Sequence, residues 1–231
     1  ISIGSLVDLW DIQSSSPHLP SGDEIEQALE KVDYNKIIVN SDNNTMLLAE
    51  QGMSIDLGAI AKGFIADRLV EYLSETKVRS AMLNLGGNLY LYGSKPDGSL
   101  WQIGIRNPYG SQGEYIGIIK VKDMSVVTSG IYERYFEIEG KRYHHILNPK
   151  TGYPEDNNIA SVSIVCPSSI MADGLSTTVF LLGIDKGMKL IESLEKTEAI
   201  IITKDKKVFL SSGIKDDNLP FKLTDETFEL D

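Results

Sequence analysis

Residues 166–183 read CPSSIMADGLSTTVFLLG, and this segment has the apolar content and the length of a buried helix. Positions three and four apart share one face of a helix. One stripe of this helix carries Ile170, Asp173, Thr177, Phe180 and Leu181. A helix normally buries its apolar stripe, so Asp173 and Thr177 stand where leucine or valine is expected.

The carboxylate at position 173 needs a partner, because an ionised carboxylate is costly to bury unless a cation or several hydrogen-bond donors meet it. The hydroxyl of Thr177, one turn along the helix, supplies a second oxygen rather than a positive charge. The pair therefore indicates half of a site for a hard cation. The other interpretation is that Asp173 caps a helix that begins at Gly174.

The segments around this helix mix helix and strand patterns without a regular βα alternation. Hairpin or paired-strand patterns occur over 36–50, 80–93 and 198–213, a strand pattern over 159–166, and helix patterns over 25–32 and about 59–74. This mixture predicts an α+β fold with mainly antiparallel sheets and packed helices. Since no repeat, low-complexity run or linker is visible, we expect a single domain over 1–231.

Composition restricts the class of protein. The chain has 231 residues, of which 42% are hydrophobic and 24% are charged, and these values are typical of a globular protein with a sizeable core. The net charge of -11 argues against nucleic acid as a partner. No apolar stretch approaches the roughly 18 to 20 residues of a membrane span, and no signal peptide is visible. The chain starts at Ile1 without Met, so we expect a trimmed N-terminus.

Two glycine-containing segments have the character of ligand contacts. The segment DLGAIAKG (56–63) places Asp56, Gly58 and Lys62 around a helix start, where backbone N–H groups and a lysine favour phosphate. A capped helix with one snorkelled lysine explains the same pattern. The segment LNLGGNLY (83–90) has paired glycines inside a strand pattern, which indicates either a structural bulge or the close approach of a ligand.

The segment YHHILNPKTGYP (143–154) contains two of the three histidines, His144 and His145. Successive residues of a strand point to opposite faces, so at most one of them addresses a given site. A neutral imidazole near pH 7 can take a proton from a hydroxyl group. The alternative for either residue is a surface histidine or a hydrogen-bonded core histidine.

Seven segments, in order along the chain, together resemble the ApbE-type FAD:protein FMN transferases. They are ISIGSLVDLW, IDLGAIAKGFIADR, LNLGGNLYLYG, WQIGIRNP, TSGIYERYF, HHILNPKTGYP and ADGLSTTVFLLG. The resemblance implies one ApbE-like domain and a magnesium-dependent enzyme with FAD as its substrate. Such an enzyme splits FAD at the pyrophosphate, attaches FMN to a threonine or serine hydroxyl of an acceptor protein, and releases AMP.

The resemblance also implies the metal site. By position, Asp173 and Thr177 correspond to ligands of Mg²⁺, together with the backbone carbonyl of Ala59. Oxygen ligands with room for substrate phosphate are what Mg²⁺ prefers. The polar residues in the apolar stripe are thereby explained.

For the nucleotide and the acceptor, the resemblance assigns FAD contacts to Asp56 and Lys62. It places Ile146 against FAD, and it makes His145, immediately before ILNPKTG, the base that deprotonates the acceptor hydroxyl. His144 is the less favoured of the two histidines. Further flavin contacts of the family lie upstream of ISIG, where this chain begins.

Two other functions remain open. A hydrolase that cleaves FAD to FMN and AMP uses the same metal with water as the nucleophile, and a non-catalytic protein could keep only the FAD contacts. The family usually acts outside the cytoplasm as a lipoprotein, on redox subunits at the membrane face. We therefore expect an exported protein whose membrane association depends on an N-terminal anchor outside this sequence.

Overall fold

The computed structural model describes residues 1–216 and 219–231, and the chain divides into two compact units. Unit 1 consists of Ile1–Ala59 and Ile131–Asp156, and unit 2 of Ile60–Gly130 and Asn157–Asp231. Both units combine helices with antiparallel strands, which confirms the predicted α+β class. The single domain over 1–231 stays a prediction, because compact units can belong to one domain.

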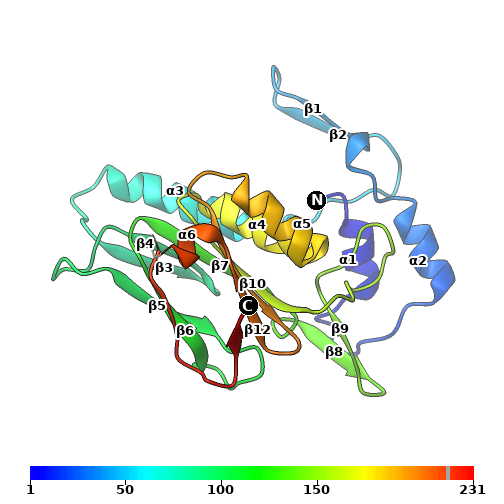
Figure 1. The fold of residues 1–231 in the computed structure, drawn as a ribbon. Coiled ribbons are helices and arrows are strands. Elements are labelled where there is room, and N and C mark those ends of the chain that lie inside the picture. Colours follow the sequence, from blue (N-terminus) through cyan, green and yellow to red (C-terminus); the bar gives the residue numbers. More distant parts are fainter. Residues whose placement is uncertain (217–218) are drawn as a thin grey trace. The chain divides into compact units, whose positions relative to one another are not determined.

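Unit 2 is built on a sheet of seven strands, with three helices on one face (Figure 1). The strand order is β14 (Glu229–Leu230), β12 (Lys207–Leu210), β11 (Glu198–Thr203), β10 (Ile159–Cys166), β7 (Met124–Gly130), β4 (Asn88–Tyr92) and β3 (Ala81–Leu85). The helices are α3 (Ala61–Ser74), α4 (Ser169–Leu182) and α5 (Ile184–Glu192). Neighbouring strands are antiparallel except β12 and β14.

The other face of this sheet packs on a second sheet. Its strands are β13 (Phe221–Leu223), β6 (Tyr115–Val121) and β5 (Trp101–Arg106), and the short helix α6 (Ser212–Lys215) completes unit 2. Side chains of both sheets form one apolar core, which includes Ile105, Ile119 and Val165. All eight residues of β10 are buried, because this strand has a helix on one face and the second sheet on the other.

Unit 1 has its own smaller core. Its elements are α1 (Gly4–Trp10), α2 (Gly22–Leu29), a 3₁₀ turn (Tyr34–Lys36), the hairpin β1 (Ile37–Asn40) and β2 (Thr45–Leu48), and the hairpin β8 (Tyr135–Ile138) and β9 (Lys141–His144). Trp10 is fully buried, stacks on Phe136 and Tyr143, and donates its indole N–H to the Gly152 carbonyl at 2.7 Å. These contacts fix the turn that follows the two histidines.

Local sequence signals predicted most elements correctly. The sequence predicts a helix over 25–32, and α2 spans Gly22–Leu29, three residues earlier at both ends, because Ser21 starts it with a complete capping box to Glu24. The paired glycines separate two strands, as the paired-strand pattern over 80–93 predicted, but they do not form a bulge: Gly86 and Gly87 have φ of +61° and +93° and form the two-residue turn of the β3–β4 hairpin. The close approach of a ligand at this turn stays a prediction. No helix of the described residues is long and apolar enough to cross a membrane.

Candidate functional site

The polar residues Asp173, Ser176 and Thr177 of α4 lie on the side of that helix that is buried or half-buried. Ser168 caps α4, so Asp173 lies one turn inside it, and the interpretation of Asp173 as a cap for a helix from Gly174 is wrong. Asp173 is 4% exposed and Thr177 is half-buried. The small residues Ala172 and Ser176 share the buried face and allow α4 to lie close to β7 and β10.

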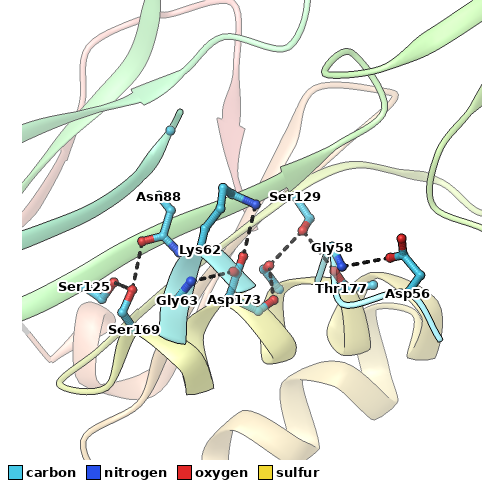
Figure 2. A network of polar contacts seen from close by, with 12 residues as sticks. Asp56, Gly58, Lys62, Gly63, Asn88, Ser125, Ser129, Ser169, Asp173 and Thr177 are labelled. Carbon is cyan, nitrogen blue, oxygen red and sulfur yellow. Dashed lines mark hydrogen bonds and ion pairs between the residues drawn. The ribbon is translucent and has the colours of Figure 1, made fainter. Parts of the chain in front are cut away.

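Two groups from the first turn of α3 meet the Asp173 carboxylate (Figure 2). The backbone N–H of Gly63 donates to Oδ2 at 2.8 Å, and the ammonium of Lys62 lies 3.7 Å from Oδ1. Lys62 and Asp173, which the sequence singled out for FAD and for the metal separately, therefore lie side by side. The position of this carboxylate at a helix N-terminus is also electrostatically favourable.

Thr177 belongs to a row of hydroxyl groups between α4 and β7. Its Oγ1 lies 3.3 Å from Ser129 Oγ, and Ser129 Oγ lies 2.8 Å from Ser176 Oγ. Ser176 in turn donates to the main-chain carbonyl of Asp173 at 2.8 Å. The side of the helix that carries the carboxylate thus presents neutral oxygens one turn further on (Figure 2).

This donor set fits a magnesium ion that keeps most of its coordination for water and phosphate. Among residues 1–216 and 219–231, no group of three or more His, Cys, Asp or Glu side chains could hold a metal ion. A complete protein cage is not what Mg²⁺ requires, since it is commonly bound by one or two carboxylates plus substrate phosphates. Of the three predicted ligands, Asp173 and Thr177 lie in unit 2, and Ala59 is an exposed residue of unit 1.

The two histidines of unit 1 have different surroundings. His144 is 5% exposed, and main-chain groups meet both of its ring nitrogens: Nε2 lies 3.1 Å from the Glu155 carbonyl, and Nδ1 accepts from the Ile146 N–H at 3.3 Å. His145 is half-buried, and its Nδ1 lies 3.2 Å from the Arg134 carbonyl. That contact requires the Nδ1–H tautomer, which places the lone pair of His145 on Nε2.

The remaining predicted contacts also lie in unit 1. Asp56 is half-buried, and its Oδ1 accepts from the Gly58 N–H at 2.8 Å, which shapes the turn before α3. Ile146 is 3% exposed, directly after His145. In unit 2, the single cysteine, Cys166, is buried, and burial raises the pKa of its thiol to about 11.

Sequence analysis missed three residues of the unit 2 site. Gly63 provides the amide for Asp173, Ser129 provides the hydroxyl beside Thr177, and Asp67 binds the first turn of α4 through Ser169 N–H at 2.7 Å and Ile170 N–H at 3.0 Å. A glycine next to Lys62 inside a helix pattern was the one local signal of a close approach.

The sequence of the chain is similar to that of known proteins. A sequence model of the ApbE family matches residues 1–201. A protein of Klebsiella pneumoniae (strain 342) named FAD:protein FMN transferase is 40% identical over 212 residues, which are 92% of this chain and 65% of that protein. The protein of the same name in Treponema pallidum (strain Nichols) is 39% identical, with 93% and 63% covered. The chain thus spans somewhat less than two thirds of these relatives.

Solved structures agree with the sequence comparison. The crystal structure of an ApbE protein from Thermotoga maritima superposes with a TM-score of 0.84 at 32% identity, covering 93% of this chain and 70% of that one. The flavin transferase ApbE from Vibrio cholerae gives a TM-score of 0.81 at 30% identity, with 94% and 69% covered.

Proposed function

Because this chain belongs to the ApbE family, we propose that it carries the catalytic machinery of an FAD:protein FMN transferase that depends on Mg²⁺. The substrates are FAD and a protein with an accessible threonine or serine hydroxyl. The hydroxyl oxygen forms a bond to the phosphorus of the FMN half, the bond between that phosphorus and the bridging oxygen breaks, and AMP leaves with the bridging oxygen. The product is FMN attached to the acceptor through a phosphoester.

The observation that carries this proposal is the buried Asp173 carboxylate with Lys62 at 3.7 Å and the Gly63 N–H at 2.8 Å. We assign Lys62 to the pyrophosphate of FAD, and its position in the N-terminal turn of α3, where anions are favoured, supports this assignment. Asp173 and Thr177 are the residues of unit 2 that would hold Mg²⁺, and the Ala59 carbonyl stays a predicted third ligand. The bound ion would neutralise the negative charge that develops on the phosphate oxygens.

In unit 1, His145 is the proposed general base. Its Nδ1–H is directed to the Arg134 carbonyl, so Nε2 is the nitrogen that takes the acceptor proton. His144 is held by main-chain groups on both nitrogens and has a structural role. Asp56 and Ile146 are proposed FAD contacts. A location outside the cytoplasm and a lipid anchor rest on the family resemblance alone and stay predictions.

In the direct test, the purified protein is incubated with FAD, Mg²⁺ and an acceptor domain of a redox subunit. Flavin on the acceptor is then measured by in-gel fluorescence, and free flavins are measured by chromatography. The same acceptor domain with its hydroxyl residue replaced by alanine is the control. We expect fluorescence on the acceptor, stoichiometric AMP and no label on the control. Free FMN with an unlabelled acceptor would instead identify an FAD pyrophosphatase, and unchanged FAD would identify a binding protein.

A further inference from the structure

Helices α3 and α4 touch through their backbones at one point. A Cβ at Gly63 would overlap the main chain of Ser169 and Ile170. Gly63 is followed one turn later on α3 by Asp67, and Asp173 is one turn beyond Ser169 on α4. Since Asp67 binds Ser169 and Asp173 binds Gly63, the two helices run antiparallel at this contact.

Asp67 satisfies the N-terminal end of α4. Its Oδ1 accepts from the Ser169 N–H at 2.7 Å, and its Oδ2 accepts from the Ile170 N–H and the Ser168 hydroxyl, both at 3.0 Å. The cap residue Ser168 reaches only the next amide, that of Met171, at 3.4 Å. Asp67 is therefore the side chain that binds the first two of the otherwise orphaned amides of α4.

Asp173 performs the reciprocal role for α3. The N-cap residue of α3, Ile60, has no side-chain cap, and the Gly63 amide of the first turn donates to Asp173 instead. Each helix thus supplies a carboxylate to the N-terminal turn of the other. Both carboxylates gain from the partial positive charge of the helix end that they meet.

We propose that Asp67 is a positioning residue for the Asp173 site. In this proposal Asp67 acts through α4 and contacts neither FAD nor Mg²⁺. It binds the first turn of α4, and Asp173 follows one helical turn later, so Asp67 sets where the Asp173 carboxylate lies relative to Lys62 and the Gly63 amide. The assignment of Asp173 to Mg²⁺ rests on the proposed function. The placement of Asp173 by Asp67 rests on the described contacts alone.

The test compares Asp67→Ala and Asp67→Asn with Ser21→Ala, which removes the N-cap of α2 in unit 1 and controls for the loss of a helix cap. The first measurement is hydrogen exchange at the Gly63 amide at a temperature where every variant is folded. We expect exchange about tenfold faster in Asp67→Ala, because the bond to Asp173 loosens, and an unchanged rate in Ser21→Ala. Asp67→Asn keeps the size and one acceptor oxygen, so it should fold and change in the same direction by less.

The second measurement is the Mg²⁺ concentration that gives half-maximal flavin transfer. Loss of a residue that orients a metal ligand typically weakens metal affinity or activity by about 10- to 100-fold, and we expect a shift of this order in Asp67→Ala but none in Ser21→Ala. Unchanged Gly63 exchange in both Asp67 variants would reduce Asp67 to a stability cap and overturn the proposal. Faster Gly63 exchange in a protein without any transfer activity would support the positioning role and contradict the proposed function instead.

Discussion

The Asp173 site of unit 2 and the histidine turn of unit 1 (residues 144–155) are held by opposite means. Side-chain charges and helix ends hold the first: Asp67, Asp173 and Lys62 each act through a charged group. Main-chain carbonyls and amides contact both histidine rings and the Trp10 indole in the second, and one side-chain bond lies within it, from Asn148 Nδ2 to Glu155 Oε2 at 2.6 Å. Substitutions of the charged side chains in unit 2 should therefore shift the groups that they bind. In the histidine turn, one histidine should affect the transfer rate and the other the stability of the protein.

The largest effect is expected for Asp173→Ala. The change removes the only charged ligand that the proposal assigns to Mg²⁺, and it leaves the Gly63 N–H without its partner. Turnover should fall to the level seen without added metal, and the free energy of unfolding should fall by about 1 to 3 kcal/mol, because a buried donor is left unsatisfied. Transfer rates over a Mg²⁺ titration and denaturant unfolding measure the two effects. Wild-type turnover at limiting Mg²⁺ would refute the assignment.

The next effect distinguishes the two histidines. His145→Asn should keep FAD binding but lower the transfer rate by about 10²- to 10⁴-fold, the usual contribution of a general base. His144→Asn should lose about 1 to 3 kcal/mol of stability, since asparagine cannot reach both the Glu155 carbonyl and the Ile146 amide from the same position, while folded molecules keep their transfer rate.

Rates at saturating FAD and acceptor between pH 6 and 9, with bound FAD measured separately, test this pair. If His144→Asn is the inactive variant, or if His145→Asn no longer binds FAD, then His145 is not the base. In that case the main-chain contacts of the histidine turn hold a ligand-binding residue rather than only the local structure. The proposed difference between the two units would then be wrong.

A smaller effect is expected for Lys62→Met. Its ammonium is the one cation that the described contacts place beside Asp173, at 3.7 Å, and we propose that it binds FAD equally in the ground state and the transition state. The KM for FAD should therefore rise about tenfold with little change in kcat. Lys189→Met, an exposed change on α5, is the control. A loss confined to kcat would place Lys62 in the chemical step.

The sequence predicted what depends on local pattern. The helical period correctly buried Asp173, and strand patterns marked the hairpins in the 36–50 and 198–213 segments. It could not predict the bonds of Gly63 to Asp173 or of Asp67 to Ser169, because the partners are more than a hundred positions apart and no local pattern encodes them. The alternation of side chains along a strand does not apply to both histidines, because β9 ends at His144 and His145 lies beyond it.

Thr177→Val is the smallest expected effect and the most specific test of the metal side of the comparison. The two side chains have nearly the same shape, so the change removes one neutral oxygen that lies 3.3 Å from Ser129 Oγ and little else. A water molecule can replace a neutral ligand of Mg²⁺ more easily than a carboxylate. We therefore expect the Mg²⁺ concentration for half-maximal transfer to rise about threefold, with unchanged turnover at saturating Mg²⁺.

Thr178→Val is the matched control, because this neighbour is exposed and donates only to the Gly174 carbonyl of its own helix. Threonine and valine are both β-branched, so neither substitution adds branching to the helix. An equal shift in Thr178→Val would therefore show that a general change of the helix, rather than the Thr177 oxygen, governs metal binding.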